Sequence, residues 1–570
     1  MKITRKSFIG GISVAVFVGA VAVAVSAMAD ESLMLVRLRV PHTVDDVQWA
    51  KTFKALSENR GACDEVWFTS GVAFPLMDWH QAHAARLARY AEQLRGAGIV
   101  PSLQIQATLG HSDEMTLTRD ARYGVGAEGK TWSGFTGPDG VECRACSCPR
   151  QPELLAYVRE MAMLYAVFKP AWVWIDDDLR IDNHAPAIGF DNIGCWCQTC
   201  LAAFNAETGG EWTREALASA IKKNPTLYDA WERFSFAGIA EVARVIASAM
   251  HEVSPETRFG YQHCHWRNDA PLAIFKAMHE ATGLPAGSRP GGGSYYDHNP
   301  NPLIVKSIGE ARQMKMLGAP DWIGTWCPEV ETYPRAFASR TAQGILLESI
   351  ASLAYGMNAV SLNIMDPCVE TDDWYSENML APLAAERPVL EGYRDWNRDT
   401  MPAGLADETG ASTETLYQYS LTGVPVVPGV GKTFGSVFAR DMKLEDPGYP
   451  ILGSGLLPNL STKVIRDIRR RADERSGGRL PVLVRDPSVA LVVPRVTKDG
   501  RLKSVMMLNA RIDVQKPVTL ALRGVAPDVT SATWRAFRNP PVALPLRREG
   551  GETLVTLPEI SAWNAGWLAL

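Results

Sequence analysis

The sequence lacks several features that would point to a nucleic-acid partner or to other common enzyme classes. Lys and Arg number 58 against 63 Asp and Glu, so the formal net charge is -5 and basic residues are not in excess. Proteins that bind nucleic acid usually carry such an excess, so no nucleic-acid partner is expected. The HExxH motif of zinc peptidases and the G-x-S-x-G elbow of serine hydrolases are also missing.

Long apolar runs are scarce, and the single one lies at the N-terminus. Residues 8–25 follow a short basic segment, and Ala27-Met28-Ala29 then supplies a small-x-small cleavage site. This order is typical of a secretory signal peptide, so we expect residues 1–29 to be removed on export to the periplasm or beyond. The segment TRKSFI resembles a twin-arginine signal with Lys as the second basic residue, which leaves the Tat and Sec routes open. No stable membrane anchor is expected.

The sequence has 10 Cys, and their spacing is more informative than their number. Six of them fall in two short segments: Cys143, Cys146 and Cys148, then Cys195, Cys197 and Cys200. A C-x-C pair is too close in the chain for an easy mutual disulfide. Thiolates that converge on a tetrahedral zinc explain this density better than disulfides do. The other four follow apolar runs, which is typical of core residues: Cys63, Cys264, Cys327 and Cys368.

Short apolar runs alternate with helical patterns over the first two thirds of the chain. The eight expected strands are residues 33–40, 65–69, 100–106, 171–175, 258–263, 286–290, 321–326 and 359–364. Eight strand-and-helix units over this length predict a (β/α)8 TIM barrel, which we place at residues 30–402. A doubly wound open sheet is the alternative, but no glycine-rich phosphate loop supports it.

Two smaller domains are expected after a change of composition at residues 402–410. Residues 403–487 combine short strand patterns with a helical run at 464–475, capped by Ser461, and predict a small α/β domain. Residues 488–570 show recurring strand patterns, such as ALVVPRV and KSVMMLNA, without a helical period. We therefore expect a C-terminal β-sandwich.

The fourth expected strand ends in three consecutive carboxylates, Asp176, Asp177 and Asp178. Barrel enzymes hold their active sites at the C-terminal ends of the strands, and clustered carboxylates raise one another's pKa. The seventh strand is followed by Glu329 and Glu331. Two carboxyl groups at two strand ends predict glycoside hydrolysis, in which one protonates the leaving oxygen and the other attacks or activates water. A solvated acidic loop or a calcium site remains the alternative for the Asp residues.

Other polar and aromatic side chains follow strand ends and are candidates for binding a sugar. The sequence has 17 Trp, many beside polar residues, and aromatic rings suit the apolar face of a pyranose. Each such Trp, and each His, is about as consistent with simple packing, and Arg180 could instead pair with one of the Asp residues. The candidate substrate-binding residues are Asp177, Arg180, His263, His265, Arg289, Trp326, Asp366 and Trp374, with Tyr295, Tyr296 and Asp297 nearby.

These motifs resemble family 42 of the glycoside hydrolases, the bacterial β-galactosidase type within the large clan of retaining barrel enzymes. The family's fourth strand ends Trp-x-x-Asp-Asn-Glu, and the corresponding run here is Trp174-Ile175-Asp176-Asp177-Asp178, one residue shorter. The resemblance places Asp178 at the family's acid/base Glu and Asp177 at its sugar-binding Asn. The family's Glu-x-x-Pro nucleophile motif corresponds to Glu331-Thr332-Tyr333-Pro334, and Glu329 stays an alternative because it lies nearer the strand.

The resemblance also extends to the cysteines and to the domain order. The family's Cys-x-Cys-x-x-Cys before a Phe, and its upstream Cys-Pro, imply a structural zinc on Cys148, Cys195, Cys197 and Cys200, with Cys143 or Cys146 as substitutes for Cys148. The family's middle domain mediates trimerisation, so residues 403–487 imply a homotrimer. The two substitutions to Asp point to a substrate other than the usual β-galactoside.

The sequence as a whole therefore predicts an exported glycoside hydrolase. We expect a retaining, exo-acting enzyme for a β-galactoside-like or related glycan, with zinc in a structural role. Two alternatives are a barrel that binds glycans without cleaving them and a metal-dependent hydrolase that uses Asp176 to Asp178 with His263 and His265.

Overall fold

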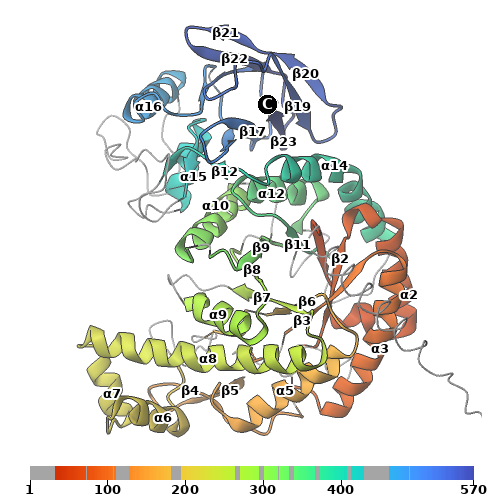
Figure 1. Cartoon of the computed structure of the whole chain (residues 1–570), viewed down its shortest axis with the longest axis vertical. Coiled ribbons are helices and arrows are strands. Elements are labelled where there is room, and N and C mark those ends of the chain that lie inside the picture. Colours follow the sequence, from red (N-terminus) through yellow and green to blue (C-terminus); the bar gives the residue numbers. More distant parts are fainter. Residues whose placement is uncertain are drawn as a thin grey trace, which may run out of the picture. The chain divides into compact units, whose positions relative to one another are not determined.

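The computed structural model (Figure 1) describes most of the chain beyond the N-terminal segment. The described residues are 32–71, 74–106, 108–110, 128–180, 194–263, 270–293, 295, 301–318, 320–332, 339–365, 373–406, 413–428, 461–486 and 488–570. The expected signal segment, His265, Tyr296, Asp297 and Asp366 lie outside them. The chain divides into two compact units, one built of residues 1–53, 63–263 and 270–287 and one of residues 54–62, 264–269 and 288–570.

The first unit contains a parallel sheet whose strands are buried on both faces. Its strands are β1 (Met34–Arg37), β2 (Glu65–Thr69), β3 (Val100–Ile105), β6 (Trp172–Ile175), β7 (Arg258–His263) and the start of β8 (Ala286–Pro290). Strands β1, β2, β3, β6 and β7 pair in this order, and every pair is parallel. Because helices cover such strands, their residues are buried and largely apolar, as in the run Trp172 to Ile175, which is wholly buried.

Helices follow these strands, and two further segments are inserted between them. The helices are α2 (Asp46–Glu58), α3 (Met77–Gly96), α5 (Pro152–Ala166), α8 (Pro225–Val253) and α9 (Ala270–Thr282), with one-turn helices η1 (Val40–Thr43) and η2 (Arg60–Ala62). Figure 1 shows the long helix α8 running beside α5 and α9, which it contacts extensively. The insertions are the hairpin β4 (Gly134–Thr136) and β5 (Glu142–Ser147) and the helices α6 (Gln198–Thr208) and α7 (Arg214–Ile221).

The second unit contributes the remaining barrel strands. They are the end of β8, β9 (Ile323–Trp326), β10 (Glu329–Glu331) and β11 (Val360–Asn363), and β10 pairs with β11 in parallel. Strands β9 and β10 are separated by two residues, Cys327 and Pro328. Pro328 interrupts the ladder of hydrogen bonds because it has no backbone N–H. The two are therefore halves of one barrel strand. The associated helices are α10 (Asn301–Met316), α12 (Ala342–Ala354), α13 (Asp373–Tyr375), η4 (Ser376–Leu380) and α14 (Ala381–Trp396).

Nine strands belong to one sheet, and counting β9 and β10 as one gives the eight of a (β/α)8 barrel. The later part of the second unit is rich in antiparallel strands. One sheet has the order β12-β16-β17-β23-β19-β20 and another the order β15-β18-β22-β21, and their facing side chains include Val492, Met507, Leu520 and Trp534. Alternation of buried and exposed residues, as in β19, is typical of a sandwich. The fold class predicted from the sequence is confirmed.

The bounds of these later elements are as follows. The strands are β12 (Met401–Pro402), β13 (Leu405–Ala406), β14 (Val426–Val427), β15 (Val482–Val484), β16 (Leu491–Val496), β17 (Leu502–Asn509), β18 (Val518–Leu522), β19 (Ser531–Ala536), β20 (Val542–Pro545), β21 (Arg547–Glu549), β22 (Glu552–Leu557) and β23 (Asn564–Ala569). The helices are α15 (Thr413–Leu421) and α16 (Thr462–Arg475), and Ser461 caps α16 by accepting from the Val464 amide. Within the described part of the chain, every helix is too short or too polar to cross a membrane.

Candidate functional site

The three Asp residues after β6 have three different environments. Asp176 lies in the barrel interior, where its Oδ2 accepts from Gln104 Nε2 at 2.6 Å and Gln106 Nε2 at 3.1 Å. Arg37 Nη2 lies 3.9 Å from its Oδ1 and the Arg37 Nε donates to Gln104 at 3.1 Å. Gln104 lies in β3 and Gln106 directly follows it. Side chains two residues apart in a strand point to the same face, so both Gln residues reach the same carboxylate. Asp176 therefore belongs to a connected polar set contributed by three strands of the sheet, β1, β3 and β6.

Asp178 is fully buried and its carboxylate organises a neighbouring loop. Its Oδ2 accepts from the backbone amides of Thr108 at 2.8 Å, Leu109 at 3.0 Å and Gly110 at 2.7 Å. The Thr108 hydroxyl donates to Oδ1 at 2.6 Å. All four partners are donors, which suits an ionised carboxylate that only accepts. Asp178 thus anchors residues 108–110.

Asp177 is the most exposed of the three. A quarter of its side chain is accessible, compared with none of the Asp178 residue. Its Oδ2 pairs with Arg180 Nη2 at 3.0 Å, and the Arg180 side chain is 5% exposed. The predicted pairing of Arg180 with an Asp is thereby present, and Asp177 is its partner. A ligand can reach the Asp177 carboxylate more readily than that of Asp178.

The strand β10 carries both Glu candidates, and Glu329 has the more elaborate surroundings. Its Oε1 pairs with the Arg289 guanidinium, and both side chains are nearly inaccessible. Its Oε2 accepts from Tyr295 Oη at 3.3 Å and from the Gly292 amide at 3.4 Å. Arg289 lies at the end of β8, and Gly292 and Tyr295 follow it. The predicted polar segment after β8 therefore converges on Glu329.

Glu331 lies two residues further along the same strand, in register with Asn363 of β11. Its side chain is buried, and its carbonyl oxygen accepts from Arg340 Nη1 at 3.0 Å. Both carboxylates are thus presented by one short strand. Arg289 and the Tyr295 hydroxyl hold the Glu329 side chain.

Three other predicted substrate-binding residues are described by the structure. His263 is buried at the end of β7, where its ring packs edge-on against Phe275 with centroids 5.5 Å apart. Trp326 is buried, and its indole N–H donates to the Ile323 carbonyl at 3.1 Å. Trp374 is half-buried on α13. These contacts favour packing roles for His263 and Trp326, the simpler of the two interpretations offered by the sequence.

A second candidate site is a group of four buried thiols, Cys148, Cys195, Cys197 and Cys200, whose sulfurs all lie within 4.8 Å of one another. Cys148 Sγ lies 3.6 Å from Cys197 Sγ and 3.5 Å from Cys200 Sγ. Sulfurs about 2.3 Å from a tetrahedral zinc would be about 3.8 Å apart, so the group could hold a metal ion. Cys143 and Cys146 form a separate pair, in which the Cys146 thiol hydrogen-bonds to Cys143 and lowers the Cys143 pKa to about 6.

Local structure explains how the four thiols converge. Cys197 is the N-cap of α6 and Cys200 lies in its first turn, where the helix dipole favours thiolates. The Thr136 amide of β4 donates to Cys195 Sγ at 3.3 Å. Gly194 is required beside them, because its φ is 80° and a Cβ there would lie 2.1 Å from Ser235 Oγ.

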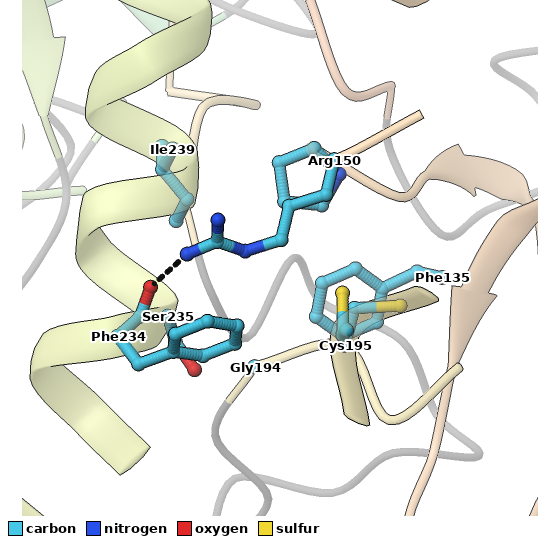
Figure 2. A pocket seen from close by; sticks show the side chains of 9 residues that line it. Phe135, Arg150, Gly194, Cys195, Phe234, Ser235 and Ile239 are labelled. Atoms are coloured by element: carbon cyan, nitrogen blue, oxygen red, sulfur yellow. Dashed lines mark hydrogen bonds between the residues drawn. The ribbon is translucent and has the colours of Figure 1, made fainter. Parts of the chain in front are cut away.

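The thiols are buried in a largely apolar cluster. Figure 2 shows Phe135, Phe234 and Ile239 around a small cavity beside Cys195, with Arg150 donating to the Phe234 carbonyl at 2.8 Å. Hydrogen bonds from the other three thiols lower the pKa of Cys197, whereas burial raises that of Cys195. A buried thiolate needs a compensating cation, and a metal ion would supply it to all four sulfurs.

Sequence reasoning missed several residues that complete these sites. Arg37, Gln104 and Gln106 lie within strand patterns that looked merely apolar, and their contacts to Asp176 come from strands up to about 140 residues apart in the chain. The charged residues behind β10, Lys306 and Glu348 among them, lie within helical patterns. The sequence did contain one sign of these contacts, because a polar residue inside an apolar strand or helix pattern indicates a buried polar interaction.

Comparisons with known proteins show the fold. No protein-family model matches the chain, and no curated protein matches it. Its structure is similar to an α-L-fucosidase isoenzyme 2 from Paenibacillus thiaminolyticus, with a TM-score of 0.58, 10% identity and coverage of 94% of this chain and 99% of that one. It is also similar to a β-galactosidase from Bacillus circulans sp. alkalophilus, with a TM-score of 0.55, 11% identity and coverage of 94% and 98%.

A family 42 β-galactosidase from G. stearothermophilus gives a TM-score of 0.55, 10% identity and coverage of 94% of this chain and 98% of that one. These matches run over nearly the whole length of each protein. The resemblance to family 42 indicated by the sequence motifs therefore extends to the fold. At identities near 10% the likeness establishes architecture, and the chemistry has to be argued from the residues of this chain.

Proposed function

We propose that this protein is an exported, retaining glycoside hydrolase in which Glu329 is the nucleophile and Asp177 the proton donor. Asp177 follows β6 and Glu329 is the first residue of β10, the second half of the seventh barrel strand. The C-terminal ends of barrel strands carry the active sites of such enzymes. The resemblance of the sequence motifs to family 42 implies Asp178 and Glu331 for the same two roles, with Glu329 as the alternative to Glu331. We propose Glu329 because of the donors on its carboxylate, and Asp177 because its side chain is accessible whereas that of Asp178 is not.

The observation that carries the proposal is the environment of Glu329. A nucleophile must be ionised and held in place, and Arg289 supplies both a positive charge and a fixed donor. Tyr295 donates to the other carboxylate oxygen. The carboxylate forms a bond to the anomeric carbon while the bond to the leaving oxygen breaks and that oxygen takes the proton of the acid. The resulting ester is neutral, so the donors act before this step, by holding the charged carboxylate in position for attack.

The proton donor has to reach the glycosidic oxygen, which argues for Asp177. Asp178 is 0% exposed and already accepts four hydrogen bonds from residues 108–110. A quarter of the Asp177 side chain is accessible, and its carboxylate forms an ion pair with Arg180. Because an arginine favours the ionised form, Asp177 acts as an acid only if Arg180 turns toward the bound sugar.

The substrate we propose is a terminal sugar of galactose or fucose configuration, released by exo action. Support comes from the proteins of similar fold, which are named as β-galactosidases and as an α-L-fucosidase. Zinc on the four thiols would have a structural role and would stabilise the segment around α6 and β4. It would not be catalytic, because a closed four-sulfur site leaves no position for a reacting water. A homotrimer through residues 403–487 completes the proposal, and light scattering of the purified protein tests it.

A panel of nitrophenyl glycosides tests the activity, and one pair of variants tests the nucleophile. Glu329→Ala should lose at least about a thousandfold in kcat, and azide should restore turnover by giving a glycosyl azide of inverted configuration. Glu331→Ala is the matched control, since it removes the same side chain two residues away on the same strand. Loss and azide rescue in Glu331→Ala alone would reverse the assignment, and no hydrolysis of any glycoside by the wild-type protein would refute the function.

A further inference from the structure

Four charged side chains are buried behind β10, and we call them the β10 clamp: Lys306, Glu310, Arg340 and Glu348. Lys306 and Glu310 lie on α10, Glu348 lies on α12, and Arg340 precedes α12. The side chains of Lys306, Arg340 and Glu348 are 0% exposed. Buried ions are costly unless they are paired and hydrogen-bonded, so such a group needs an explanation beyond stability.

The geometry of β10 shows what the clamp is bonded to. Backbone groups on one edge of the strand pair with β11, because the Ser361 amide donates to the Pro328 carbonyl at 3.3 Å and the Thr332 amide donates to the Asn363 carbonyl at 3.1 Å. Successive residues of a strand direct their backbone groups to opposite edges. The backbone groups of Glu329 and Glu331 therefore point to the other edge of β10.

On that other edge the clamp takes the place of a neighbouring strand. The Lys306 ammonium donates to the Glu329 carbonyl, and the Glu329 amide donates to Glu310 Oε1 at 3.1 Å. Arg340 Nη1 donates to the Glu331 carbonyl at 3.0 Å. Three backbone groups of the two glutamates are thus held by charged side chains.

Glu348 joins the two cations of the clamp. Its Oε1 lies 3.0 Å from Lys306 Nζ and its Oε2 lies 2.7 Å from Arg340 Nη2. It touches neither glutamate in the contacts described, so it acts on β10 through Lys306 and Arg340. Lys306 and Arg340 carry two positive charges against the single negative charge of Glu348. Burial raises the pKa of Glu310, the second carboxyl group of the clamp, well above its ordinary value.

We propose that Glu348 is a positioning residue, which fixes the backbone of β10 through Lys306 and Arg340 and so sets where the carboxylates of Glu329 and Glu331 stand. This rests on the proposed function for its catalytic consequence. A displacement of about 1 Å at a reacting group can cost about a hundredfold in rate, so rigid backbone at this strand has a direct use.

The test must separate positioning from stability, and an apolar replacement of the ion group does so. The triple variant Lys306→Met, Arg340→Met, Glu348→Leu removes all three buried charges together, a change that is often neutral or stabilising. The triple variant leaves Glu310 as the remaining ionisable group of the clamp. Because burial raises its pKa, Glu310 can remain protonated and neutral in this variant. The variant should melt near the wild-type temperature while lacking every charged donor to the two carbonyls.

Two measurements are made on the wild type and the triple variant. Hydrogen exchange of the peptide covering residues 326–332 should become at least about tenfold faster, since β10 loses bonds on one edge. With the best aryl glycoside of the panel, kcat should fall about 10- to 100-fold with KM changed less than about threefold. Arg469→Met in α16 is the control, because it removes a buried arginine remote from β10 and should leave both readouts unchanged.

The outcomes separate this proposal from the proposed function. Wild-type exchange in the folded triple variant, or wild-type kcat despite faster exchange, would overturn the positioning role. If the wild-type protein hydrolyses no glycoside, the proposed function fails, and the exchange measurement still decides whether the clamp holds β10. Should the triple variant not fold, Lys306→Arg carries the same two readouts, because it keeps the pair with Glu348 but moves the donor to Glu329.

Discussion

Replacing Asp178 by Ala should destabilise the protein far more than a catalytic role would require. The change removes a carboxylate that accepts from the amides of Thr108, Leu109 and Gly110 and from the Thr108 hydroxyl, at 2.6 to 3.0 Å. Asp178 is 0% exposed, so water does not replace it directly. Three backbone N–H groups and one hydroxyl would lose their acceptor.

The expected cost follows from the number and kind of these bonds. A hydrogen bond to a charged group contributes about 1.5–3 kcal/mol, and a buried donor left without a partner costs about 1–3 kcal/mol. Because the four bonds share one carboxylate and the loop can partly relax, we expect about 3–6 kcal/mol for Asp178→Ala. With a slope of about 3 kcal/mol/M, the urea midpoint followed by tryptophan fluorescence should fall by about 1–2 M.

Two less disruptive variants should lower the free energy of unfolding by smaller amounts. Asp178→Asn keeps one oxygen for the three amides, and its NH2 can donate to the Thr108 hydroxyl, so it should cost only about 1–2 kcal/mol. Thr108→Val removes the hydroxyl alone and should cost about 1 kcal/mol. Equal urea midpoints for wild type and Asp178→Ala, with unchanged hydrogen exchange at residues 108–110, would refute the anchoring role and return Asp178 to the catalytic candidates.

Three further predictions concern other parts of the chain. Burial raises the pKa of Glu65 to about 7 from an ordinary 4.5, so the folded state binds the proton more tightly, and stability should fall by about 2–3 kcal/mol as pH rises from 4.5 to 7. Glu65→Gln should remove this decline in thermal unfolding, and an equally steep decline in the variant would contradict the assignment. Cys200→Ser should abolish bound zinc in metal analysis of the purified protein, whereas Cys143→Ser should retain about one ion per chain. A full complement of zinc in Cys200→Ser would count against the four-thiol site. Arg469→Met should lower stability by about 3 kcal/mol in urea, because the guanidinium donates to four carbonyls at 2.6 to 3.0 Å, and an unchanged midpoint would show that these bonds contribute little.

The barrel strands could be predicted from the sequence because each is a short apolar run between turn residues. The predicted strands 258–263 and 286–290 coincide with β7 and β8, and 100–106 exceeds β3 by one residue. Parallel strands covered on both faces are apolar at most positions, so the run itself marks the strand. The seventh strand was only partly predicted, since Pro328 interrupts it and β10 carries charged residues.

The four-thiol group could also be predicted, for a different reason. Three of its members lie within six residues, so local geometry brings them together whatever the rest of the fold does. The fourth, Cys148, was chosen by the family resemblance over Cys143 and Cys146, and the structure places Cys148 in the group. Short-range spacing is informative where the partners of a side chain are near it in sequence.

The roles of the three Asp residues could not be predicted in this way, because their partners are remote. The hydrogen-bond donors to Asp178 lie 68 to 70 positions earlier in the chain. Those to Asp176 include residues 70 and 72 positions earlier. A run of three identical side chains gives no local sign of which one a loop will bond. Only the register of β3 beside β6 decides it.

The same limit explains the choice between Glu329 and Glu331. A strand period of two directs both side chains to one face of β10, so the sequence pattern treats them alike. Arg289 and Tyr295, which contact Glu329, come from a segment that begins 40 residues earlier, and nothing local ties them to either glutamate. Long-range contacts of this kind, such as those of Arg289 and Tyr295 with Glu329, come from the fold and leave no mark in the local sequence around β10.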